Sequence, residues 1–73
     1  DALPVRDRSL VTVAMLAALG RTGELRAHLT GARNVGLSQE ELVEVLMQVA
    51  VYAGVPVANE ALNVAAEVFD VPT

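Results

Sequence analysis

Apolar residues recur at helical spacing through most of this chain and predict helices rather than strands. A first helix is expected over residues 4–19, starting at a proline whose missing N–H costs nothing there. Residues 10–19 are apolar nearly all round, so we expect other helices to surround that half. A second helix is expected over residues 24–34, with Gly36 as its left-handed cap. Its apolar stripe consists of Leu25, Leu29 and Ala32.

The third predicted helix has the clearest start in the chain. Ser38 and Glu41 have the spacing of a capping box, and Leu37 and Leu42 are placed to form the accompanying hydrophobic staple. This helix is expected to end near residue 53, with an apolar face widened by Val43 and Met47. A fourth helix is expected to open at Pro56. The predicted fold class is therefore all-α, a compact bundle of about four short helices.

The chain is short and unusually apolar for its length. It has 73 residues, enough for one domain at most, and 53% of them are hydrophobic. One Phe, one Tyr and no Trp are present, so the apolar residues are mostly small. We infer that apolar surface remains after folding, and that it is covered by a homo-oligomer or by a missing part of the same polypeptide.

Charge and cysteine content narrow the classes of partner. The net charge is −4, and the five basic residues are scattered, so nothing favours a nucleic-acid partner. No apolar run approaches the roughly 20 residues that span a membrane. The chain has no Cys, which rules out thiol chemistry within it and fits a cytoplasmic protein. With one His as well, we expect no metal site.

The only histidine, His28, lies in the second predicted helix. It follows Leu25 by three residues and precedes Ala32 by four, so it shares or borders the apolar stripe. Two interpretations stay open from spacing alone. One is a satisfied histidine in a core or an interface, and the other is a group for acid–base chemistry.

Six segments carry a family resemblance, in order and across nearly the whole chain. They are RSLVT (8–12), LAALGR (16–21), ELRAHLTGA (24–32), NVGL (34–37), EELVEVL (40–46) and VYAGVPVAN (51–59). Together they resemble the carboxymuconolactone decarboxylase family. The resemblance implies an AhpD-like, all-α domain over residues 1–73 that assembles into trimers or hexamers. It also implies sites containing His near subunit interfaces.

The family has two main branches, and residue types separate them here. The alkylhydroperoxidase branch uses Cys-x-x-Cys, and the matching positions hold Arg21 and Glu24; its assisting glutamate falls near Ser9. Peroxidase activity that depends on Cys is therefore disfavoured. The other branch, which this sequence resembles throughout, implies a lyase without a cofactor. Its reaction converts 4-carboxymuconolactone to 3-oxoadipate enol-lactone in protocatechuate (β-ketoadipate) catabolism of aromatic compounds.

The resemblance implies site residues for a small lactone acid substrate. His28 and Glu44 are the catalytic candidates, with Glu44 able to orient His28 or simply to lie on a solvated helix face. Arg8 suits anchoring of a carboxylate, although a surface charge or an interface salt bridge explains it equally well. Tyr52 and Asn59 are candidate substrate-binding residues. Their alternatives are helix packing for the tyrosine and capping for the asparagine.

One departure from the family leaves an alternative function open. Decarboxylases of this kind carry a further N-terminal segment rich in Trp, and we expect the domain over residues 1–73 to lack it. The segment is disordered or removed, or the chain is a fragment, or it is a shortened relative with another substrate. A domain fused behind the hydrolase of the next pathway step would also explain the abrupt start. The rival function is that of a non-catalytic or differently specific oligomeric member.

Overall fold

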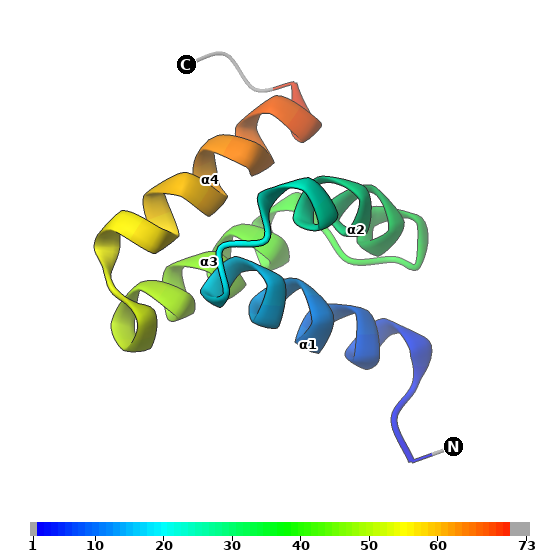
Figure 1. Cartoon of the computed structure of the whole chain (residues 1–73). Helices are drawn as coiled ribbons and strands as arrows, with labels where there is room; N and C mark the ends of the chain where they lie inside the picture. The colour runs from blue at the N-terminus through cyan, green and yellow to red at the C-terminus, as the bar shows by residue number, and fades with distance from the viewer. Residues whose placement is uncertain (1, 71–73) are drawn as a thin grey trace.

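Four helices follow one another along the chain and are joined by short turns (Figure 1). The computed structural model describes residues 2–70. The helices are α1 (Val5–Ala18), α2 (Thr22–Asn34), α3 (Gln39–Ala53) and α4 (Val55–Phe69). No strand occurs within residues 2–70. The all-α, four-helix prediction is confirmed.

The helices enclose one core in which α1 and α4 lie between the other two. α1 packs against α2 and α3, and α4 packs against the same two helices, whereas the backbones of α2 and α3 hardly approach each other. Small and medium apolar side chains fill the space where the four helices meet. The core residues include Val13, Ala17, Leu25, Leu29, Ala32, Leu37, Leu42, Leu46, Val49, Ala61, Val64 and Ala65.

The first two helices end in the same way. Each is followed by a glycine with positive φ, at +73° for Gly20 and +101° for Gly36. The N–H of the next residue bonds the carbonyl five positions back, at 2.9 Å for Arg21 and 3.1 Å for Leu37, as in a Schellman motif. The predicted cap at residue 36 is therefore confirmed. α2 begins two residues earlier than predicted, so Gly23 lies inside it rather than in the preceding turn.

The start of α3 is a capping box that also ties this helix to α1. The Ser38 hydroxyl accepts the N–H of Glu41 at 3.0 Å, and the Glu41 carboxylate accepts the N–H of Ser38 at 2.9 Å. Leu37 and Leu42, which flank the box, are both buried, as the staple prediction requires. The Arg6 guanidinium of α1 donates to the same carboxylate. The Ser38 N–H, and then Arg6, lower the pKa of Glu41 below its usual value of 4.5.

One face of α1 stays open within a single chain. Only Val13 and Ala17 of this helix are fully buried, and Met15 on the opposite side is 57% exposed. We expected other helices to surround residues 10–19. This expectation is wrong for one chain, because only one side of α1 packs against other helices. The prediction that Val43 and Met47 widen the apolar packing face of α3 is also wrong, since both side chains are exposed.

Replacing Ser38 by Ala should destabilise the fold by about 1 kcal/mol, because the Glu41 N–H loses its acceptor at the helix start. Chemical denaturation at one fixed protein concentration measures the change. Ser9→Ala in the middle of α1 is the matched control and should be neutral or slightly stabilising. Equal losses for both variants would contradict a capping role for Ser38.

The lowered pKa of Glu41 makes a pH-dependent contribution to stability. Since the folded pKa lies below the unfolded one, this contribution is present above about pH 4.5 and is lost as the pH falls through the folded pKa. The gap in unfolding free energy between the wild type and Glu41→Gln should therefore narrow on acidification. Denaturation curves from neutral to acidic pH test this, with the exposed Glu60→Gln as the control. A gap that stays constant below pH 4.5 would contradict the assignment.

Candidate active site

His28 is exposed at the edge of the packed face of α2. Burial of Leu25, Leu29 and Ala32 fixes the rotation of this helix about its axis. His28 borders that stripe, as the spacing predicted, but its ring does not enter the core of its own chain. The interpretation of a satisfied core histidine is therefore wrong for a single chain. No hydrogen bond or ion pair of His28 occurs within the described residues.

The flank of α2 that carries His28 is the one turned toward α1. Arg26, on the other flank, donates to Glu67 of α4 at 2.7 Å. His28 lies two residues further on, about 200° round the helix axis. Because α2 packs on only α1 and α4 to any extent, the imidazole lies on the α1 side. An exposed imidazole there can exchange protons with a bound molecule and with water.

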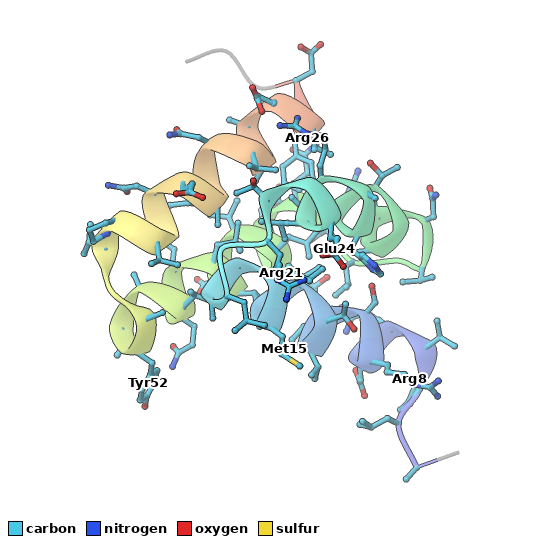
Figure 2. All side chains as sticks on the ribbon, viewed as in Figure 1. Arg8, Met15, Arg21, Glu24, Arg26 and Tyr52 are labelled. Atoms are coloured by element: carbon cyan, nitrogen blue, oxygen red, sulfur yellow. The ribbon has the colours of Figure 1, made fainter. Side chains whose placement is uncertain are left out.

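Two charged residues share that flank, and the site prediction had overlooked them. Arg21 donates to Glu24 at 3.2 Å, and both side chains are mostly exposed. Figure 2 shows the two labelled side chains together at the edge of α2 that faces α1. Glu24 precedes His28 by four residues, which places the two one turn apart on one helix face. The four-residue spacing between Glu24 and His28 is the signal in the sequence that could have identified Glu24.

Arg8 lies in the first half of α1 and is exposed. Its guanidinium donates to the Leu3 carbonyl at 3.1 Å. Arg6, which faces α3, is two residues earlier in the same helix, so Arg8 lies about 200° round from it and is turned away from α3. The helices that carry Arg8 and His28, α1 and α2, pack against each other.

Tyr52 stands at the rim of an apolar groove between α1 and α3. It is 84% exposed, near the C-terminal end of α3. The groove has a volume of about 380 Å³, and its apolar lining includes Leu10, Ala14, Met15, Val45 and Val49. In Figure 2, Tyr52 and Arg8 lie at opposite sides of the view, so one chain does not bring them into one site. A side chain this exposed does not pack between helices of its own chain, so the helix-packing alternative does not hold within one chain.

Glu44 and Asn59 lie elsewhere on the surface. Glu44 lines a shallow hollow of about 420 Å³. Met47 of the same helix and Phe69 of α4 line it as well. Since α3 hardly touches α2, the structure does not bring Glu44 to His28 within one chain. Asn59 is exposed in the second turn of α4, whose first turn has no side-chain cap, so capping does not explain it. The roles of all five candidates stay predictions.

Within residues 2–70, no group of three or more His, Cys, Asp or Glu side chains is arranged to hold a metal ion. None of the four described helices combines the length and apolar character needed to cross a membrane. The His28 imidazole and the charged side chains on the same flank of α2 are groups that can transfer protons and stabilise charge.

Comparison with known proteins agrees with the motifs that surround these residues. Residues 1–67 match the model of the carboxymuconolactone decarboxylase family. The chain belongs to this family. A curated relative, a 4-carboxymuconolactone decarboxylase of Acinetobacter baylyi, is 49% identical over 67 residues. The match covers 92% of this chain and 50% of the relative, so the chain spans about half the length of that protein.

Proposed function

We propose that this chain decarboxylates 4-carboxymuconolactone, without a cofactor, in the protocatechuate (β-ketoadipate) pathway of the cytoplasm. The observation that carries the proposal is the 49% identity to a 4-carboxymuconolactone decarboxylase, over a stretch that includes His28. Membership of the carboxymuconolactone decarboxylase family supports it as well. The absence of Cys leaves these 73 residues without the thiols that the peroxidase branch requires.

The substrate supplies its own electron sink. When the carboxylate leaves as CO₂, the electron pair of the broken C–C bond moves through the ring double bond onto the lactone carbonyl oxygen. The resulting dienolate then takes one proton on carbon and becomes 3-oxoadipate enol-lactone. The protein has to stabilise the dienolate oxygen and deliver that proton.

We assign the proton delivery to His28. Its imidazolium donates a ring proton to the dienolate carbon and recovers one from water, so the enzyme is unchanged after each turnover. The exposed position on the α1 side of α2 supports this role, because a bound lactone can reach the ring. Arg8, on the adjacent helix, is the proposed anchor for the second carboxylate of the substrate.

We further propose that the working site forms between copies of the chain, in a trimer or hexamer. Arg8 and Tyr52 lie too far apart to contact one lactone from a single chain (Figure 2). The exposed apolar side chains of α1 and α3, among them Met15, Val51 and Tyr52, give a second chain surface to cover. Association would therefore bury this surface and bring the remaining candidates near His28.

The variant His28→Ala tests the catalytic assignment. CO₂ release from 4-carboxymuconolactone should fall by at least about 100-fold, as expected for a lost acid–base group. Unfolding free energy should change by less than about 0.5 kcal/mol, because the side chain is exposed. Thr30→Ala, exposed on the same helix, is the matched control and should keep full activity. A wild-type assembly that releases no CO₂ would refute the proposed reaction, and a fully active His28→Ala would refute the role of His28.

The variant Met15→Glu tests the assembly. Sedimentation should show the wild type as an oligomer and Met15→Glu shifted toward single chains, because association would bury an unpaired charge. Asn63→Glu adds the same charge at an exposed polar position of α4 and should leave the assembly intact. A wild-type protein that stays monomeric at micromolar concentration would contradict the proposal.

A further inference from the structure

Glu24 occupies the position from which a carboxylate can reach the His28 ring. Residues four apart on a helix have Cβ atoms about 5–6 Å from each other. Helical side chains lean toward the N-terminus, so the His28 ring lies over the turn that contains Glu24. Both side chains are exposed, and both belong to the α2 flank that faces α1.

The Glu24 carboxylate is held on one side and open on the other. Its Oε1 accepts from Nη1 of Arg21 at 3.2 Å (Figure 2). Within residues 2–70, its Oε2 accepts no hydrogen bond, and the ring nitrogens of His28 have no partner. A carboxylate anchored through one oxygen, one turn before an unpartnered imidazole, is suited to accept a ring N–H through the other oxygen.

Other carboxylates are worse placed to serve His28. On α4, Glu67 pairs with Arg26 on the far flank of α2. On α1, Asp7 lies in the first turn, 4.0 Å from the Arg6 guanidinium. Glu44 belongs to α3, which hardly touches α2. Of these acidic groups, only Glu24 lies on the same helix face and one turn from the ring.

We propose that Glu24 is a positioning residue for His28, accepting one ring N–H so that the other ring nitrogen is directed at the substrate. The inference rests on the proposed function and deepens it. Glu24 neither gives nor takes a proton in this step, because the proton given to the dienolate leaves from the other ring nitrogen and is replaced from water. Covering of this flank by substrate or by a second chain would strengthen the bond, since it removes competing water.

The first test needs no substrate. His28 is the only histidine, so ¹⁵N NMR of the ring reports a single residue. In the neutral ring, the wild type should show one dominant N–H tautomer. In Glu24→Ala the ratio should move toward that of histidine in a short unstructured peptide. Arg21→Gln removes the ion pair but keeps the carboxylate, so its ratio should stay closer to that of the wild type than the ratio of Glu24→Ala does.

The second test is kinetic. Glu24→Ala should lower kcat by about tenfold or more with little change in KM, as expected when an oriented imidazole loses its acceptor. Glu60→Ala, an exposed glutamate of α4 without a neighbouring histidine, should leave both values unchanged. Circular dichroism should show equal helix content in all variants, since alanine is the best helix former.

The outcomes separate this inference from the proposed function. An unchanged tautomer ratio in Glu24→Ala would overturn the positioning role, whether or not the enzyme is active. The same change in Arg21→Gln as in Glu24→Ala would also overturn it, because the ion pair rather than the carboxylate would then be responsible. A changed ratio in a protein without decarboxylase activity would keep the Glu24–His28 contact but refute the proposed reaction.

Discussion

The position of His28 depends on how the apolar stripe of α2 packs against α1 and α4. Burial of Leu25, Leu29 and Ala32 fixes the rotation of the helix and leaves Arg26 on one flank and His28 on the other. Truncating a leucine in such a position costs about 2–5 kcal/mol, a large part of the stability of a small domain. His28 itself contributes nothing to the core of its own chain. Its position is nevertheless determined by the packing of α2 into that core.

The size of the chain links folding to the proposed function. A domain of this length has too little interior to bury all of its apolar side chains, and α1 and α3 keep open apolar faces. The same structure spreads the candidate site residues over separate parts of the surface. Both features have one explanation if copies of the chain associate, because association would cover the apolar faces and assemble the site.

The sequence predicted what depends on local chemistry. Ser38, Glu41 and Gly36 have their predicted roles because a cap and a left-handed turn are decided by neighbouring residues. The packing of α1 was not predictable in this way, since an all-round apolar helix gives no sign of which side is covered. The exposure of Tyr52 and the separation of Glu44 from His28 were missed for a related reason. Spacing along one helix says nothing about which other helix lies beside it.

A subunit-mixing experiment tests the central claim, that His28 works in a site shared between chains. The variants His28→Ala and Tyr52→Ala, each of which we expect to assemble without activity, are dissociated together and reassembled in equal amounts. If His28 of one chain works with Tyr52 of another, random mixing leaves about one site in four with both residues intact. We therefore expect activity to return to about a quarter of the wild-type level. Mixed assemblies that remain inactive would contradict a site shared between these two residues.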